Sequence, residues 1–213
     1  MPGGGVVVRR QFATPSGSPG PLPKASTYVP SWHGCDKRAE TQHPKTSLKT
    51  IHDWLQGELM ASTTPEIIVK DHGSGEIADF IVVWKDQGRR SVWFYHCKGM
   101  KGTSPSDRVA EAYEVLGQAI RSASWVATKK LVEELYDRTD AAGRGSQLVK
   151  GTRTFVKSLA NNFRSNEWDY RVVVVQPGFK CSSILFSGKV QALVTSAYEW
   201  ITNAGANFVI WGS

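Results

Sequence analysis

The feature that most constrains the fold is an unbroken run of β-branched residues near the carboxyl end of the chain. Residues 171–176 read RVVVVQ, and such a run is typical of a strand that is buried on both faces. Residues 188–203 have apolar side chains at helical spacing, and NFVIW at 207–211 reads as another strand. A strand, a helix and a strand in succession imply a parallel pair with a right-handed crossover. We therefore expect an α/β fold.

The first quarter of the chain has a different composition from the rest. Residues 1–46 are rich in Gly, Pro, Ser and Thr, and we expect an irregular basic arm there, with residues 6–8 as a candidate edge strand. The first 50 residues carry seven Lys or Arg against two acids, and so hold +5 of the net charge of +7. This basicity favours an anionic partner such as DNA, although the arm alone could provide the attraction.

The remainder, residues 47–213, is long enough for one domain with its own core. No run approaches the roughly 18 apolar residues of a membrane span, and the first residues lack the apolar stretch of a secretory signal. We expect a soluble cytoplasmic protein with no membrane partner. Periodicity predicts a first helix that begins after Ser47, strands at 66–70, 77–84 and 91–97, and helices at 104–125, 127–138 and 152–161.

The second and third strands carry charged side chains where valines and aromatics predominate. Asp79 lies on the second strand, and His96 and Lys98 lie on the third. Because side chains alternate along a strand, His96 and Lys98 share a face and Cys97 lies on the other. A Cys97 nucleophile with His96 as its base is therefore excluded. The alternative, an Asp79–Lys98 ion pair that only fixes the hairpin, rarely repays its desolvation.

An acid on one strand and a lysine at the end of the next suit phosphodiester hydrolysis. The reaction needs a metal to bind the scissile phosphate and activate water, and a cation to stabilise the developing negative charge. In this interpretation Asp79 is a metal ligand and Lys98 supplies the ammonium group.

The order of elements, with Asp79 on the second strand and HCK at 96–98 on the third, resembles the PD-(D/E)xK nuclease superfamily. The strings GEIADFIVVW, VWFYHCKG and RVAEAYEVLGQAIRSASW are similar to nuclease domains attached to superfamily 2 helicases in prokaryotic DNA-processing and defence proteins. The resemblance covers residues 47–213. It implies a restriction-endonuclease-like, three-layer core with a central mixed sheet, a helical insertion and a final helix and strand. It also implies a divalent-metal-dependent endodeoxyribonuclease, with DNA and a helicase domain or subunit as partners, that could act as a homodimer.

The chain departs from the family pattern at the metal site that the resemblance implies. His96 replaces the acid that the family carries two residues before the lysine. We expect Mg²⁺ or Mn²⁺ to be held by Asp79, His96 and the backbone carbonyl of Cys97. Imidazole suits Mn²⁺ better than Mg²⁺, which prefers oxygen ligands. Glu76 can supply the missing acid if neighbouring glycines permit a bulge, and Glu58 on the first helix is a second candidate.

The resemblance further implies a phosphate contact from the helix that follows the third strand, where Gln118 matches. The helical pattern also allows an ordinary solvated face, with Glu111, Glu114 and Gln118 opposite an apolar stripe. The members of that stripe are Val109, Ala112, Tyr113, Leu116 and Ile120.

Other residues have simpler interpretations. We expect Asp71 to form a turn, and the aromatic residues at 84 and 93–95 to pack in the sheet rather than stack on bases. A zinc site at His33, Cys35 and His43 is disfavoured because the ligands are loosely spaced in a loop. The missing acid leaves a second function open, which is a catalytically degenerate module of the same fold that binds nucleic acid or docks within a larger protein.

Overall fold

The sheet of this chain is assembled from strands at both ends of the sequence. The computed structural model describes residues 8–9, 26–42, 47–71, 75–86, 88–106, 108–139, 146–164, 167–181 and 188–213. Its strands are β1 (Val8–Arg9), β2 (Ser26–Tyr28), β3 (Pro65–Asp71), β4 (Phe80–Asp86), β5 (Arg89–Cys97), β6 (Ser146–Lys150), β7 (Trp168–Val175) and β8 (Asn207–Trp211). Its helices are α1 (Ile51–Ala61), α2 (Val109–Ser122), α3 (Lys129–Arg138), α4 (Arg153–Asn161) and α5 (Gly188–Asn203), with a 3₁₀ turn at Ala123–Trp125. The predicted α/β class is confirmed.

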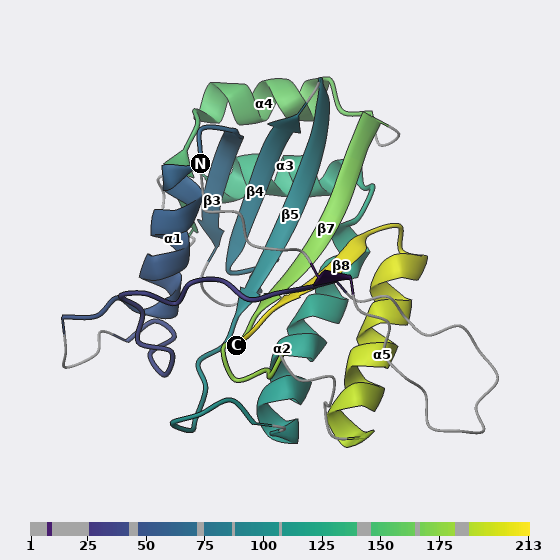
Figure 1. The fold of residues 1–213 in the computed structure, drawn as a ribbon. Coiled ribbons are helices and arrows are strands. Elements are labelled where there is room, and N and C mark those ends of the chain that lie inside the picture. Colours follow the sequence, from purple (N-terminus) through teal and green to yellow (C-terminus); the bar gives the residue numbers. More distant parts are fainter. Residues whose placement is uncertain are drawn as a thin grey trace.

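The described strands form one mixed sheet in the order β1-β2-β8-β7-β5-β4-β3-β6 (Figure 1). Strands β3, β4 and β5 are antiparallel neighbours, whereas β5, β7 and β8 run parallel. The predicted parallel pair at the end of the chain is therefore confirmed. Its helix ends before Gly205, whose φ of 91° is a conformation that glycine adopts at little cost.

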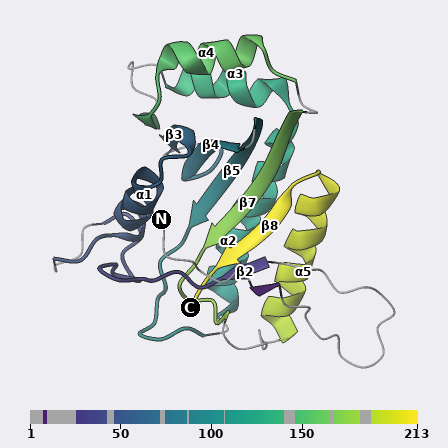
Figure 2. The same ribbon diagram turned by 45° about the horizontal axis from the view of Figure 1, so that its top comes forward.

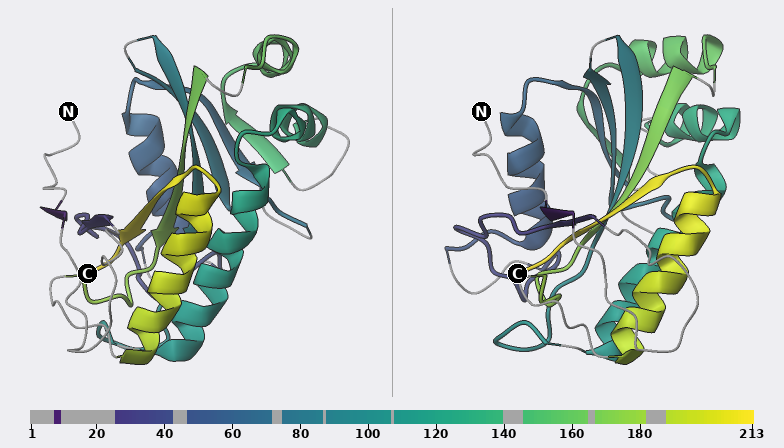
Figure 3. Two further views of the ribbon diagram at one scale, coloured as in Figure 1. Left: turned by 90° about the vertical axis from the view of Figure 1, so that its right-hand side faces the viewer. Right: turned by 45° about the vertical axis from the view of Figure 1, so that its right-hand side comes forward.

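Helices cover both faces of the sheet, as Figure 3 shows. Ile51, Trp54 and Leu55 of α1 lie in one core cluster, with Phe80 and Tyr95 from the sheet. The opposite face packs against α2, α3, α4 and α5. Figure 2 shows α3 beside α4 at one end of the sheet and α2 beside α5 at the other. None of the helices in the described ranges is both long and apolar enough to cross a membrane.

The first helix begins three residues later than expected, because Thr50 rather than Ser47 is its N-cap. The Thr50 hydroxyl accepts the backbone N–H of Asp53 at 3.0 Å and donates to the Asp53 carboxylate at 2.8 Å. This reciprocal pair satisfies an N–H that the first helical turn would otherwise leave free. Leu48 lies before the helix and is exposed.

The buried stripe of α2 differs from the predicted one. Ala112 and Leu116 are buried as expected, but Tyr113 is 70% exposed and Val109 also faces solvent. Glu111 is buried instead. Its carboxylate accepts hydrogen bonds from the backbone N–H of Lys101 at 3.1 Å, from the side chain of Arg108 at 3.3 Å and from the side chain of Gln176 at 3.5 Å. These hydrogen bonds compensate for removing the Glu111 carboxylate from water. The helical pattern alone does not reveal them, so it predicts that Glu111 is exposed.

Two strands were not predicted from the sequence. β2 lies in the segment expected to be an irregular arm, and it pairs in parallel with β8. β6 follows α3 and pairs with β3 in antiparallel fashion. Val8 of the expected edge strand belongs to β1, while residues 6–7 lie outside the described residues. β4 also begins at Phe80 rather than at Ile77, so Asp79 precedes the strand on which it was placed.

Candidate functional site

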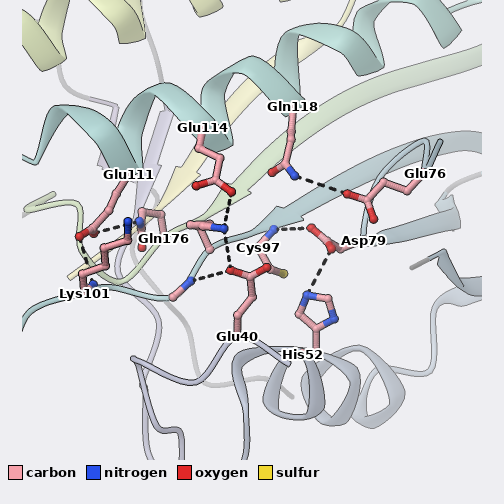
Figure 4. A network of polar contacts seen from close by, with 12 residues as sticks. Glu40, His52, Glu76, Asp79, Cys97, Lys101, Glu111, Glu114, Gln118 and Gln176 are labelled. Carbon is pink, nitrogen blue, oxygen red and sulfur yellow. Dashed lines mark hydrogen bonds and ion pairs between the residues drawn. The ribbon is translucent and has the colours of Figure 1, made fainter. Parts of the chain in front are cut away.

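The site expected from the sequence lies at one end of the β4–β5 hairpin. Phe80 pairs with Tyr95 in the antiparallel ladder, so Asp79 just before β4 lies next to the final residues of β5. The backbone N–H of Cys97 donates to Asp79 Oδ2 at 2.8 Å. The hairpin thus brings the acid to the residue that precedes Lys98. Figure 4 shows carboxylate and amide side chains gathered around this strand end.

Asp79 is buried and its charge is supported by hydrogen bonds. Asp79 is only 3% exposed, and its Oδ1 is 3.3 Å from Nε2 of His52. Burial alone would raise the pKa of Asp79, but the contact with His52, the nearby His96 and the Cys97 N–H hold that pKa below its ordinary value. Asp79 is therefore ionised at neutral pH, as a metal ligand must be.

His52 completes a group that the sequence did not indicate. Ligand atoms of His52, Asp79 and Cys97 lie within 4.8 Å of one another, and all three residues are buried. Burial raises the pKa of the Cys97 thiol well above its ordinary value, which keeps it protonated at neutral pH. A set of nitrogen, oxygen and sulfur donors suits a transition metal better than Mg²⁺. This set differs from the expected one, in which Cys97 contributed its carbonyl.

His96 faces α2, on the side of the sheet opposite the Cys97 thiol. Its Nε2 is hydrogen-bonded to the Ser122 hydroxyl at 2.5 Å, and that hydroxyl donates its single hydrogen to the carbonyl of Ile77 at 3.0 Å. Nε2 must then be the protonated nitrogen of His96. Nδ1 is left as a buried lone pair that has no partner among the described residues. The opposed directions of His96 and Cys97 agree with the exclusion of a Cys–His dyad.

Burial also fixes the charge of His96. Desolvation, partly offset by the carboxylate of Asp79 and reinforced by Arg121, lowers the pKa of His96 to about 4. His96 is therefore neutral at pH 7, and a neutral imidazole nitrogen is the form that binds metals. A metal ligand needs an unprotonated nitrogen, and Nδ1 of His96, which has no partner among the described residues, is such a nitrogen.

Lys98 pairs with two glutamates and not with Asp79. Its Nζ is 2.5 Å from Oε1 of Glu114 on α2 and 3.2 Å from Oε2 of Glu40, which precedes α1. Partial burial would lower the pKa of Lys98, but these two carboxylates raise it above its ordinary value. Lys98 is thus a stable ammonium group. The involvement of Glu40 could not be read from the sequence, because Glu40 lies in the segment expected to be an arm.

Glu76 and Gln118, two of the expected site residues, are hydrogen-bonded to each other. Gln118 Nε2 donates to Glu76 Oε1 at 3.4 Å, and the other amide atom, Oε1, is buried without a partner among the described residues. Gln118 is half-buried, so its environment is not that of an ordinary solvated face. Glu58, the second candidate acid, is exposed on α1.

The remaining candidates have structural roles. Asp71 is buried, accepts the N–H of Ile77 at 2.8 Å and pairs with Arg138 at 3.0 Å, so it does more than form a turn. Cys35 lies in the α1 core, where burial raises the pKa of its thiol to about 12. His33 is exposed, and His43 lies outside the described residues. Phe94 and Tyr95 are buried in the sheet as predicted, whereas Trp84 and Trp93 are only half-buried.

Comparisons with protein-family models, with curated proteins and with solved structures gave no match. The chemistry of the site must therefore be argued from its geometry. That geometry groups the ionised carboxylate of Asp79 with His52 and Cys97, and it places the ammonium group of Lys98 at the same end of the sheet. Among the described residues, neither His96, which faces α2, nor Glu76, which contacts Gln118, belongs to that group.

Proposed function

We propose that the chain is a divalent-metal-dependent nuclease that hydrolyses DNA phosphodiester bonds, with the restriction-endonuclease-like arrangement of the PD-(D/E)xK superfamily. One observation carries the proposal. The carboxylate of Asp79 accepts the backbone N–H of Cys97, and the next residue along the chain is Lys98. An acid that precedes β4 and an ammonium group that follows β5 thus lie at the same end of the sheet, and the reaction needs both.

The donors of the site fit a divalent metal. Asp79 supplies a carboxylate that lies with His52 and Cys97. For His96, whose Nδ1 has no partner among the described residues, and for Glu76, held by Gln118, to bind the same ion, both side chains have to turn toward Asp79. When bound, Mg²⁺ or Mn²⁺ would polarise the phosphate and lower the pKa of a water molecule. The chain also presents His52 next to Asp79 as a further nitrogen donor.

The raised pKa of Lys98 decides between two roles for that residue. A lysine that acts as a general base needs a lowered pKa, whereas the contacts with Glu114 and Glu40 raise it. We infer that Lys98 stabilises negative charge on the phosphate or orients water by hydrogen bonding. For this the Lys98 ammonium exchanges its contact with Glu114, whose side chain is 50% exposed, for the substrate.

Cleavage assays on the Asp79→Asn and Lys98→Met variants test the proposal. Plasmid, linear and single-stranded DNA are incubated with Mg²⁺ or Mn²⁺. We expect each variant to cut at least about 100-fold more slowly, because Asp79→Asn loses a charged metal ligand and Lys98→Met loses the cation at the phosphate. The matched controls are Asp137→Asn and Lys129→Met, which change exposed residues of α3. Cutting by both site variants at the wild-type rate would refute the assignment.

The choice of metal tests the role of His96 separately. Because imidazole suits Mn²⁺ better than Mg²⁺, we expect faster cleavage in Mn²⁺, and a smaller preference in the His96→Glu variant, which restores the acid of the family pattern. Rates are compared at saturating concentrations of each metal. Equal rates in the two metals for the wild-type protein would show that His96 is not a ligand.

Two observations favour a second candidate function, a degenerate module that binds nucleic acid or docks without cutting. Asp79 is almost fully buried against His52, and Lys98 is neutralised by two carboxylates. Both groups would then stabilise the hairpin only. This function predicts salt-sensitive DNA binding with no metal-dependent cleavage in the wild-type protein.

A further inference from the structure

A second polar site lies at the other end of β5. A cavity of about 740 Å³ opens between the starts of β5 and β7 and the end of β4. Its lining combines two tryptophans with four basic residues: Trp84, Trp93, Lys85, Arg89, Arg90 and Arg171. Trp84 and Trp93 lie on the sheet face that carries α1, and α1 lies near β3 in Figures 1 and 3.

The aromatic residues of this cavity are arranged as a row along one sheet face. Trp84 and Trp93 have ring centroids 5.2 Å apart, and the Arg171 guanidinium lies 4.1 Å from the centroid of Trp93. Trp93 and Arg171 are register partners on β5 and β7, so the backbone holds them side by side. Unlike Tyr95 further along β5, which is fully buried, both tryptophans remain partly exposed. Indole rings and guanidinium planes are the groups on which unpaired bases stack.

The charge of the cavity is only partly balanced within the described part of the chain, by Asp169, which lines the cavity and also acts on Arg171, and by Glu66. Arg89 pairs with Asp169 and Arg90 pairs with Glu66. Arg171 and Lys85 have no carboxylate partner among the described residues, and Nε of Arg171 is buried there without an acceptor. A buried donor with no acceptor costs free energy unless a ligand supplies one. An anion with hydrogen-bond acceptors therefore suits the cavity.

The first 25 residues of the chain do not supply such an anion. Residues 1–25 contain Arg9, Arg10 and Lys24 and no acidic residue. Like charges disfavour their packing against a basic cavity. A polyanion that also offers planar rings satisfies both the charge and the aromatic row.

We propose that this cavity binds an unpaired DNA strand, with a base stacked against Trp84, Trp93 and the Arg171 plane and with phosphates at Arg171 and Lys85. Ser91 lines the cavity and Cys97 reaches the candidate nuclease site, six residues further along β5. At about 3.3 Å per residue the two sites are about 20 Å apart, within reach of a strand of several nucleotides. The idea that this strand is the substrate rests on the proposed nuclease function. The inference predicts that the protein prefers DNA with a single-stranded segment.

Binding measured without metal tests the cavity independently of cleavage. Fluorescence anisotropy of the full chain in EDTA, with a labelled oligothymidylate of about 20 nucleotides, gives the affinity of each variant. We expect Trp93→Ala to bind about tenfold more weakly through loss of stacking, and Arg171→Met to bind more weakly with a smaller salt dependence. Matched controls are Trp200→Ala on α5 and Arg164→Met, both exposed and outside the cavity.

The outcomes separate the cavity from the nuclease proposal. The inference would be overturned if Trp93→Ala and Arg171→Met bound the oligonucleotide with wild-type affinity. It would also be overturned if the two substitutions weakened binding of a blunt duplex by the same factor. If Trp93→Ala does not fold, Trp93→Phe and Lys85→Met decide, since Trp93→Phe keeps a ring for stacking and Lys85 is exposed. Cavity-dependent binding without any cleavage would refute the nuclease and leave the binding site. Cleavage that depends on Asp79 but not on the cavity would support the nuclease and refute the binding site in the cavity.

Discussion

At the scale of single residues, burial decides the chemical state of each candidate group. His96 is neutral because desolvation outweighs the attraction of Asp79, whereas Asp79 stays ionised because its hydrogen bonds outweigh desolvation. Lys98 stays charged because two carboxylates contact it. These states could not be predicted from the sequence, since they depend on Glu40, His52 and other partners far away along the chain.

The lowered pKa of His96 makes stability depend on pH. The folded value of about 4 lies below the ordinary 6.5, so as pH falls through this window the unfolded chain takes up a proton that the folded chain does not. Folding is therefore destabilised by up to about 3 kcal/mol between about pH 6.5 and pH 4. Asp79 and Arg121 are the charged groups that act on this imidazole.

Urea unfolding in EDTA at several pH values checks this effect. We expect the His96→Asn variant to lose less stability than the wild-type protein between pH 7 and pH 4.5, since it has no such proton to take up. The exposed His33→Asn substitution is the control and should keep the wild-type slope. Parallel pH profiles for the wild-type protein and His96→Asn would contradict the buried neutral state.

At the scale of elements, local patterns predicted segments better than they predicted faces. The bounds of α5 follow directly from its periodicity and the glycine beyond it. In α2, by contrast, Tyr113 was expected to be buried and is exposed, while Glu111 is buried. Glu111 can be buried because the loop before α2 and Gln176 supply hydrogen-bond donors to its carboxylate. A helical wheel shows only the residues of the helix itself and therefore could not predict these donors.

The N-cap of α1 gives a prediction at this scale. Thr50 is buried, and its hydroxyl both accepts from and donates to Asp53. Replacement with alanine leaves the first turn without these bonds, so we expect Thr50→Ala to lower the free energy of unfolding by about 1 kcal/mol. Thermal denaturation measures the difference, with exposed Thr103→Ala as the control. An unchanged melting temperature in Thr50→Ala would show that the cap does not stabilise α1.

At the scale of the whole molecule, the central sheet could be predicted and its completion could not. Alternating and continuous apolar runs identified β3, β4, β5, β7 and β8, which form the middle of the sheet. β2 and β6 are short and poor in apolar residues, and they are strands because longer neighbours pair with them. The candidate site shows the same division. Asp79 and Lys98 follow from the hairpin, whereas His52 and Glu40 reach it only through the tertiary fold.

The most direct test of the central claim is a crystal soaked with Mn²⁺, in which anomalous scattering locates the ion and its ligands. We expect an ion bound by the Asp79 carboxylate, with Nδ1 of His96 or the carboxylate of Glu76 turned toward it and the Lys98 ammonium close to the ion's open side. An ion that binds elsewhere, with Asp79 still held by His52 and Cys97, would contradict the claim.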